Sequence, residues 1–476
     1  MPRIRFVRRA AVFALIPIAS IALGACKPDI GLDETARGIH SRVIKLDTHV
    51  DFSANVMSDS APNYVTGLPR QVDLPKMRAG FNGIFFSIYI GQANDFTPAG
   101  YARAHASNVA LFEAVHKLAE KLAPEQIEIA KTAADVRRIV AAGKLVALMG
   151  VENGYGIGTD ITNVKKYADY GARYLSLAHN GHSQLSDSNT GERDDVWMWN
   201  GVSPLGKLVV AEANKYGIML DISHPSKASN LWVMANSEAP VVASHSAVRA
   251  LCTTASRDLD DELLLALKEN GGVMQTVAFS SYVNCTPAPS AERVAALAAL
   301  ASEFGVPANN VGRGGGGRGV ALPRSAECSV GYPPEGAAAA DGRGGGRAGG
   351  RGGRGNPLDA MDDATRTRFQ AKLDAIDKTH PAPTPARRAN VQDFVNHIDY
   401  AVKLIGINHV GISSDFDGGG GIDGFNCAAE AINVTIELVK RGYTEEQIGK
   451  MWSGNLLRVM EANERVAREL QSGSQP

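Results

Sequence analysis

The stretch RVIKLDTHVDF, residues 42–52, runs from apolar, partly β-branched residues into polar ones. In an extended strand, residues i and i+2 point to the same side, so His49 and Asp51 would project toward one point. Imidazole nitrogen and carboxylate oxygen both bind divalent metals such as zinc. The pair alone does not define a site, because such spacings also arise by chance. A metal centre requires further ligands, and these are expected at the ends of other strands.

Seven further short apolar runs of the same kind follow, most of them rich in β-branched or aromatic residues. They are GIFFSIYI (83–90), KLVALMGVEN (144–153), ARYLSLAHN (172–180), YGIMLDISH (216–224), PVVASHS (240–246), GGVMQTVAF (271–279) and HVGISSDFD (409–417). Most are separated by stretches compatible with helices, and such alternation indicates a parallel sheet covered by helices. Eight units predict a (β/α)8 TIM-like barrel, whose active site lies at the carboxyl ends of its strands. A doubly wound open sheet is the structural alternative.

The first residues of the chain have the features of an export signal. The 476 residues are 44% hydrophobic and 21% charged, typical of a globular protein. Residues 1–25 hold four arginines, a short apolar run and small residues, which predicts a signal peptide. The ending LGAC resembles a lipobox, in which Cys26 becomes the lipidated first residue of the mature protein. We therefore expect an exported bacterial lipoprotein, anchored to a membrane only through lipid and facing the periplasm or cell exterior. An ordinary cleaved signal peptide is the alternative.

The rest of the chain divides by composition. Residues 27–42 are interpreted as a tether and lead-in, 43–465 as the barrel, and 466–476 as a C-terminal tail. Within 287–389 the chain carries VGRGGGGRGV and DGRGGGRAGGRGGRGNP, which predicts a long, flexible, low-complexity insertion after the seventh strand. Arg-Gly-Gly runs also bind RNA in some proteins. Removal of the leader's four arginines changes the formal net charge from −1 to −5, so no nucleic-acid partner is expected.

Polar residues stand at the ends of most predicted strands, and five of the eleven histidines lie there. These residues are Glu152, His179 with His182 nearby, His224, His245, Asp415 and Asp417. Each alone would be read as an ordinary loop residue or helix N-cap, and Asp417, which precedes four glycines, is interpreted in that way. Taken together, three imidazoles and two carboxylates are enough for two metals if one carboxylate bridges them. The mixture of imidazole and oxygen donors favours zinc, although manganese, cobalt or iron would also fit.

Several longer stretches match one known family. They are DTHVDF, PKMRAGFNGIFFSIYI, GVENG, YLSLAHN, DISH, SHSAVRALC, RDLDDELL and GISSDFDGG. With these motifs in this order, from about Val43 to Arg458, the chain resembles the membrane dipeptidase (renal dipeptidase) family of dinuclear zinc peptidases. The resemblance implies two zinc ions per chain. It assigns the first to His49, Asp51 and Glu152, and the second to Glu152, His224 and His245.

The resemblance also implies roles in catalysis. His179 would contact the substrate and stabilise the tetrahedral intermediate, and Asp415 would handle the proton of a hydroxide that bridges the metals and attacks the carbonyl. Arg257 and Tyr282 would contact the substrate, a dipeptide with an L- or D-residue at its C-terminal position. Another amidohydrolase-type enzyme, acting on N-acyl amino acids, lactones or cyclic amides, is the alternative. A protein that keeps the fold only for binding is a third reading, and the sequence leaves open whether the chain forms a homodimer.

The four remaining cysteines are an even number in a compartment expected to be oxidising, which favours disulfides. Cys252 follows the sixth predicted strand and Cys285 the seventh, and these strands are neighbours in a barrel. The family resemblance supports this pair. Cys328 and Cys427 are then left for a second bridge, which would tie the insertion to the loop after the eighth strand.

Overall fold

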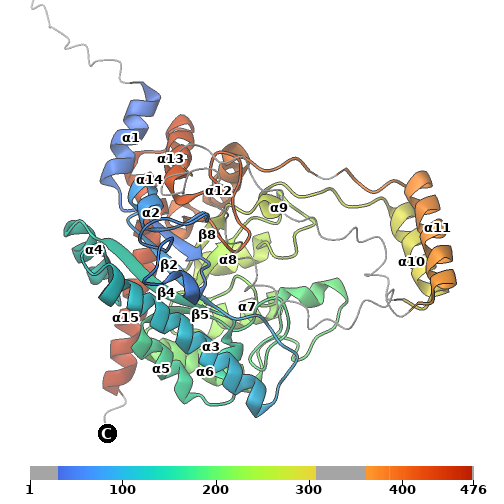
Figure 1. Ribbon diagram of the computed structural model, residues 1–476, viewed down its shortest axis with the longest axis horizontal. Helices are drawn as coiled ribbons and strands as arrows, with labels where there is room; N and C mark the ends of the chain where they lie inside the picture. Colours follow the sequence, from blue (N-terminus) through green and yellow to red (C-terminus); the bar gives the residue numbers. More distant parts are fainter. Residues whose placement is uncertain (1–30, 307–327, 329–360, 385, 474–476) are drawn as a thin grey trace, which may run out of the picture.

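A computed structural model describes residues 31–306, 328, 361–384 and 386–473 of the chain. Within these residues eight parallel strands form a nearly closed barrel with helices around it (Figure 1). The strands are β1 (Leu46–Val50), β2 (Gly83–Tyr89), β4 (Leu145–Glu152), β5 (Ala172–Ser176), β6 (Met219–Asp221), β7 (Val242–Ser246), β8 (Val273–Val277) and β9 (Val410–Ser413). Each lies inside one of the eight apolar runs. The predicted (β/α)8 barrel, with its insertion between the seventh and eighth strands, is therefore confirmed.

The barrel is closed where β1 meets the end of β9. Val50 forms a parallel bridge with Phe416, and the Asp51 amide donates to the Phe416 carbonyl at 2.9 Å. A short additional strand, β3 (Ile127–Ile129), pairs with β4 outside the path of the barrel. Three residues are too short a run to show the period-two pattern of a strand, so the sequence did not reveal β3.

Helices cover the outer face of the barrel between successive strands. They are α2 (Leu74–Gly80), α3 (Pro98–Lys117), α4 (Ala133–Ala141), α5 (Thr162–Tyr170), α6 (Pro204–Lys215), α7 (Lys227–Asn236), α8 (Asp261–Asn270) and α12 (Val391–Ile405). The short helix α9 (Ser280–Val283) follows the carboxyl end of β8. Most begin at a polar N-cap; the Asp260 carboxylate, for example, accepts from the Leu263 amide at the start of α8. Because helices cover the sheet, strands such as β1, β4 and β9 are buried along their whole length.

Both ends of the described chain are more regular than the sequence suggested. The lead-in forms helix α1 (Leu32–Arg42), which packs on α13 (Ala431–Lys440) and reaches the start of α14 (Glu445–Gly449) through an exposed ion pair. Nδ1 of His40 lies 2.8 Å from the Thr435 hydroxyl, and Arg42 pairs with Glu445. At the other end, helix α15 (Asn455–Gly473) runs through most of the segment interpreted as a tail. None of the described helices is both long and apolar enough to cross a bilayer.

The insertion also contains regular structure at its two ends. Helices α10 (Ala291–Glu303) and α11 (Asp363–Thr379) lie side by side and project away from the barrel (Figure 1). They share a small apolar cluster that includes Leu300 and Phe369. Arg293 pairs with Asp377 at 2.7 Å across the hairpin. Two parts of the predicted insertion 287–389 are thus helical, while both glycine-rich stretches lie outside the described residues.

Candidate metal centre

The candidate ligands converge at the carboxyl rim of the barrel. His49 and His245 lie on β1 and β7, and Glu152 is the last residue of β4. The others follow their strands by one to three residues: Asp51 after β1, His179 after β5, His224 after β6 and Asp415 after β9. Because parallel strands end at the same rim, residues far apart in sequence meet there. The structure thus brings together the residues that the sequence placed at strand ends.

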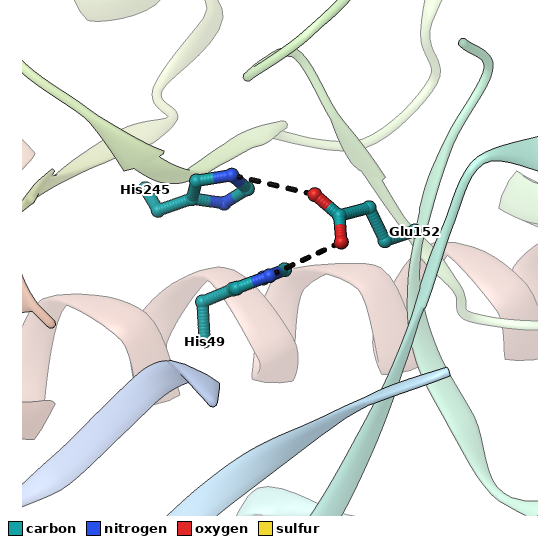
Figure 2. A group of neighbouring side chains, drawn as sticks. All are labelled: His49, Glu152 and His245. Carbon is teal, nitrogen blue, oxygen red and sulfur yellow. Dashed lines mark ion pairs between the residues drawn. The ribbon is translucent and has the colours of Figure 1, made fainter. Parts of the chain in front are cut away.

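The carboxylate of Glu152 stands at the centre of this group. Its Oε2 lies 3.3 Å from Nε2 of His49, and its Oε1 lies 3.5 Å from Nε2 of His245. Figure 2 shows the two imidazoles approaching different oxygens of the same carboxylate. A carboxylate whose two oxygens face separate donors has the arrangement of a bridging ligand.

Two more imidazoles face the same oxygen as His245. Nε2 of His224 lies 3.1 Å, and Nε2 of His179 3.5 Å, from Oε1 of Glu152. Nε2 of His224 is also 3.0 Å from Nε2 of His245. By distance alone, His179 is therefore as close to Glu152 as His245 is, although the family resemblance implies that His179 contacts the substrate.

The third part of the site is carboxylate-rich. His49, Asp51 and Asp415 each offer a ligand atom within 4.8 Å of the other two. The backbone of Gly418 passes directly over both carboxylates. A Cβ placed on Gly418 would lie 2.1 Å from Oδ2 of Asp51 and 2.3 Å from Oδ1 of Asp415. Only a residue without a side chain fits at this position.

The donor set fits divalent metal. Three overlapping groups meet the same 4.8 Å criterion: His49, Glu152 and His245; Glu152, His179 and His224; and His49, Asp51 and Asp415. Nε2 of His49 is buried and has no hydrogen-bond partner among the described residues, although it points at the Glu152 carboxylate. Imidazole nitrogens and carboxylate oxygens without thiolates suit zinc and related ions. Cys328, Cys427 and Glu430 form another compact group, but these cysteines are joined to each other.

Residues behind the ligands orient them, and the sequence did not single these residues out. The Tyr174 hydroxyl lies 2.8 Å from Nδ1 of His49, and the tyrosine ring crosses Gly150, where any Cβ would overlap it. The Ser244 hydroxyl lies 2.8 Å from Nδ1 of His245 and donates to Asp221 at 2.7 Å. Partners on the second ring nitrogen fix the orientation of a ligand imidazole. Tyr174 and Asp221 lie inside predicted strands, where side chains that face the site cannot be told from core residues.

Two carboxyl groups of the site, those of Glu152 and Asp415, have pKa values shifted in opposite directions. Burial would raise the pKa of Glu152, but the imidazoles of His49 and His179 hold that pKa well below its usual value. Burial raises the pKa of Asp415 well above its usual value; His49 opposes this, and the carboxylates of Asp51 and Glu152 add to it. An ionised carboxylate beside one that readily holds a proton is the combination expected of a ligand and a proton carrier.

The residues assigned to the substrate lie at the edge of this centre. Arg257 is buried and donates from Nη1 to the Ser246 hydroxyl and from Nη2 to the His245 carbonyl, both at 2.9 Å. Its guanidinium lies 5.9 Å from the ring of Tyr282 on α9, which stacks on Phe279. Arg257 is thereby fixed beside a candidate ligand.

Of three other residues near the rim, Tyr89 contacts a member of the centre, whereas His182 and Asp417 bond to residues outside it. The ring of Tyr89, at the end of β2, packs edge-on against His179 with centroids 4.9 Å apart, and the sequence did not indicate this contact. His182 turns away from the centre, because its Nδ1 accepts from the Ser188 amide and lies 3.0 Å from the Asp187 carboxylate. Asp417 bonds to Gln71 and lies outside the three ligand groups, which agrees with its interpretation as a loop residue.

Both disulfides expected from the cysteines are present. Cys252, after β7, is bonded to Cys285, after α9, and Cys328 is bonded to Cys427 in the segment after β9. The first bridge joins the two loops that carry Arg257 and Tyr282. The second ties the insertion to the loop that follows the last strand of the barrel.

A cluster of imidazoles and carboxylates at the carboxyl rim of a (β/α)8 barrel defines the class of metal-dependent hydrolases. The sequence model of the family described as membrane dipeptidase (peptidase family M19) matches residues 33–474. The chain belongs to this family, and it is a peptide-bond hydrolase of the dipeptidase type.

Named relatives and solved structures agree with this assignment. The chain is 26% identical over 405 residues to dipeptidase aclJ of Aspergillus oryzae, covering 84% of this chain and 72% of the relative. Dipeptidase tcpJ of Claviceps purpurea is 25% identical over 408 residues, with 84% and 71% covered. The probable dipeptidase PvdM from Pseudomonas aeruginosa superposes with a TM-score of 0.68 at 28% identity, over 92% of this chain and 99% of that one.

A more distant neighbour shares the fold. The metallo peptidase from Rhodobacter sphaeroides, solved with a phosphinate mimic of the dipeptide L-Ala-D-Ala, has a TM-score of 0.59 at 20% identity, over 88% of this chain and 99% of that one.

Proposed function

We propose that the protein is a dipeptidase that uses two zinc ions held by His49, Asp51, Glu152, His224 and His245. The observation that carries this proposal is the position of Glu152, whose Oε2 faces His49 while its Oε1 faces His224 and His245. His49 and Asp51 would complete one zinc site with Oε2. His224 and His245 would complete the other with Oε1. At such a centre, paired divalent metals activate water and polarise the carbonyl oxygen of the substrate.

Asp415 is the proposed general base. Its carboxylate lies beside Asp51 and 4.0 Å from Nε2 of His49, and burial raises its pKa, which makes the ionised carboxylate a stronger base. It can therefore accept a proton from the attacking water and donate it to the leaving amine. His179 faces Oε1 of Glu152, whereas His49 faces Oε2, and the His179 ring packs against that of Tyr89. There it can donate a hydrogen bond to the oxygen on which negative charge develops.

Arg257 is proposed to bind the terminal carboxylate of the substrate. Guanidinium and carboxylate match as two-pronged partners, and Arg257 is already held in place by Ser246 and the His245 carbonyl. Tyr282 packs on the guanidinium and would line the same pocket. A cation fixed this close to the metal ligands favours a substrate with one residue beyond the scissile bond. A dipeptide meets this requirement.

The decisive test combines metal analysis with a substrate panel. The purified protein is expected to bind two zinc ions and to hydrolyse dipeptides, while C-terminal amides of the same dipeptides react poorly because Arg257 has no carboxylate to bind. The panel should contain L- and D-residues at the C-terminal position, N-acyl amino acids, lactones and cyclic amides. Faster turnover of one of these other classes than of any dipeptide would contradict the proposed substrate.

Two matched variants test the metal assignment. His224→Ala should lose zinc and activity together. His182→Ala removes a histidine from the same rim that bonds to Asp187 and Ser188, so it should keep both. Full zinc content in His224→Ala would contradict the assigned ligand set.

We further propose that the protein is exported and lipid-anchored through Cys26. The two disulfides support an oxidising compartment, because such bonds seldom persist in the cytosol. Mass analysis of the mature N-terminus should find acylated Cys26. Cys26→Ser should release the protein from the membrane fraction without changing its turnover, and an unmodified N-terminus on the membrane-bound protein would contradict the anchor.

A further inference from the structure

The loop that carries Asp415 needs support from outside itself. Asp415 and Asp417 both adopt left-handed backbone angles, with φ of 56° and 62°. Four glycines, 418–421, follow them directly. Glycines have no side chains with which to pack and lose the most conformational freedom on ordering, so such a loop does not fix its own shape.

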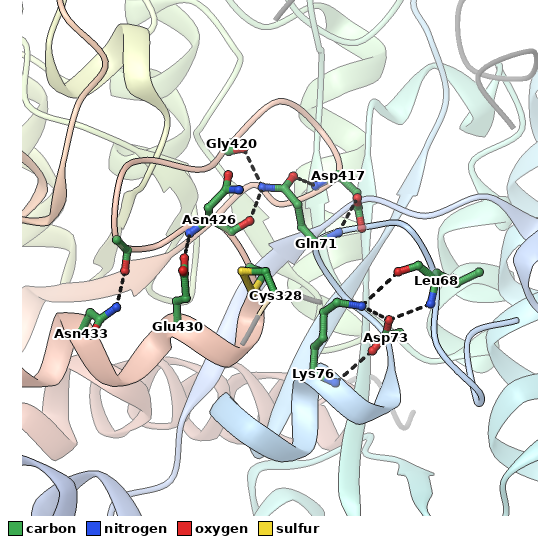
Figure 3. The surroundings of a disulfide bond; sticks show 12 residues. Leu68, Gln71, Asp73, Lys76, Cys328, Asp417, Gly420, Asn426, Glu430 and Asn433 are labelled. Atoms are coloured by element: carbon green, nitrogen blue, oxygen red, sulfur yellow. Dashed lines mark hydrogen bonds and ion pairs between the residues drawn. A yellow bond between two sulfur atoms is a disulfide. The ribbon is translucent and has the colours of Figure 1, made fainter. Parts of the chain in front are cut away.

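Gln71 supplies this support from the other side of the barrel seam, in the segment between β1 and α2. Oε1 of its side chain accepts from the backbone amide of Asp417 at 2.8 Å, and the backbone amide of Gln71 donates to Oδ1 of Asp417 at 3.1 Å. Its Nε2 donates to the carbonyls of Gly420 at 3.0 Å and Asn426 at 2.9 Å. Figure 3 shows this side chain between the three partners. The side-chain amide of Gln71 thus bonds to this loop through both its oxygen and its nitrogen.

These contacts reach Asp415 through the backbone. The amides of Gly418 and Gly420 donate to the Asp415 carbonyl at 3.2 Å and 2.8 Å, so the residues held by Gln71 enclose Asp415. The Asp415 carboxylate makes no hydrogen bond of its own to any described residue. Its direction toward His49 and Asp51 is therefore set by the backbone to which it is attached.

We propose that Gln71 is a positioning residue that orients Asp415 over the metal centre. This inference rests on the proposed role of Asp415 as the base. Gln71 is remote from the reaction, since it contacts the loop and none of the metal ligands. Loss of its amide should let the loop relax and move the Asp415 carboxylate away from its working position. A misplacement of about 1 Å can cost roughly 10²-fold in rate.

The first test uses Gln71→Met, which keeps the approximate length of the side chain and removes its three hydrogen bonds. The matched control is Arg388→Met. Arg388 donates to the Gly421 carbonyl and to Oδ1 of Asn426, so it supports the same segment without contacting residues 415–420. We expect Gln71→Met to lower kcat about 10- to 100-fold with little change in KM or zinc content, and Arg388→Met to keep kcat within about threefold. Equal losses of kcat in the two variants would overturn the proposal.

The second test asks whether Gln71 acts through Asp415. In an Asp415→Asn background, Gln71→Met should cost less than about threefold further, because the group that it positions is already gone. The same large loss in both backgrounds would show that Gln71 acts elsewhere, and would overturn the proposal even if Asp415 is the base. If Asp415→Asn itself keeps full turnover, the role of the base fails separately.

The third test needs neither substrate nor metal. Hydrogen exchange of the peptide spanning 414–421, measured on metal-free protein, should speed up in Gln71→Met, because the Asp417 amide loses its acceptor. Arg388→Met should leave that exchange rate unchanged, since Arg388 contacts carbonyl and side-chain oxygens there. Native exchange rates in Gln71→Met would mean that the loop holds its shape without Gln71.

Discussion

Adding a single methyl group at Gly418 should lower the turnover rate while leaving the stability of the protein nearly unchanged. In Gly418→Ala the new Cβ would lie 2.1 Å from Oδ2 of Asp51 and 2.3 Å from Oδ1 of Asp415, whereas ordinary contact begins at 3.4 Å. The carboxylates or the loop must therefore shift by about 1 Å. Such a shift of the base costs about 10²-fold in rate, equivalent to about 2.7 kcal/mol of transition-state stabilisation. Because Gly418 lies outside the left-handed region, alanine adds no backbone strain.

The assay is kcat, zinc content and Tm measured side by side. We expect Gly418→Ala to lose about 10²-fold in kcat and part of the zinc at the Asp51 site, with Tm within a few degrees of the native value. The control is Gly449→Ala in α14, where the nearest neighbour of the new Cβ, on Val43, is at an ordinary 3.5 Å. That variant should keep kcat and zinc. A Gly418→Ala protein with two zinc ions and kcat within twofold of native would refute the packing argument.

Three further outcomes follow from the structure. Asp415→Asn should keep its zinc while kcat falls about 10²–10⁴-fold, as measured by metal analysis and steady-state kinetics. His397 is neutral in the fold, since its Nδ1 accepts from Val248 and burial lowers its pKa to about 4. Its contribution to stability is therefore complete above about pH 6.5 and lost as pH falls toward 4, so metal-free His397→Gln should show a flatter Tm between pH 7 and pH 5 than metal-free native protein. Phe369→Ala should open the hairpin of α10 and α11 to proteolysis but leave kcat unchanged, because its cluster is separate from the barrel core.

The parts of this fold that can be predicted from the sequence are those marked by a pattern that extends over several consecutive residues. Each barrel strand is an apolar run between helix-compatible segments, and the ligands stand where such a run turns polar. For this reason the sequence alone predicts that Glu152 and His224 lie at the rim. The carboxyl ends of parallel strands share one rim, so one-dimensional positions translate directly into spatial proximity.

The remaining features depend on contacts that no local pattern encodes. Gln71 is one polar residue in an irregular segment, and nothing near it in sequence indicates a bond to Asp417, 346 residues away. Helices α10 and α11 flank glycine-rich stretches, whose composition obscures the helical pattern on either side of them. Helix α1 resembles a linker in its moderate length and polar surface, and its packing on α13 is a contact between the two ends of the chain that no local pattern indicates.

Some side chains of the site are held on strands and others on loops, and this difference indicates which substitutions should affect metal binding and which should affect proton transfer. His49, Glu152 and His245 lie within strands whose ladders fix them, so the positions of these three ligands should tolerate changes in the loops. Asp415 lies beyond the end of β9, on a backbone that depends on Gln71 from outside and on the absence of a side chain at Gly418. Substitutions in the supports of this loop should therefore reduce proton transfer before they reduce zinc content. Substitutions behind the strand ligands, such as Tyr174→Phe at Nδ1 of His49, should act first on zinc affinity. The two kinds of variant can be told apart by measuring zinc content and kcat on the same protein samples.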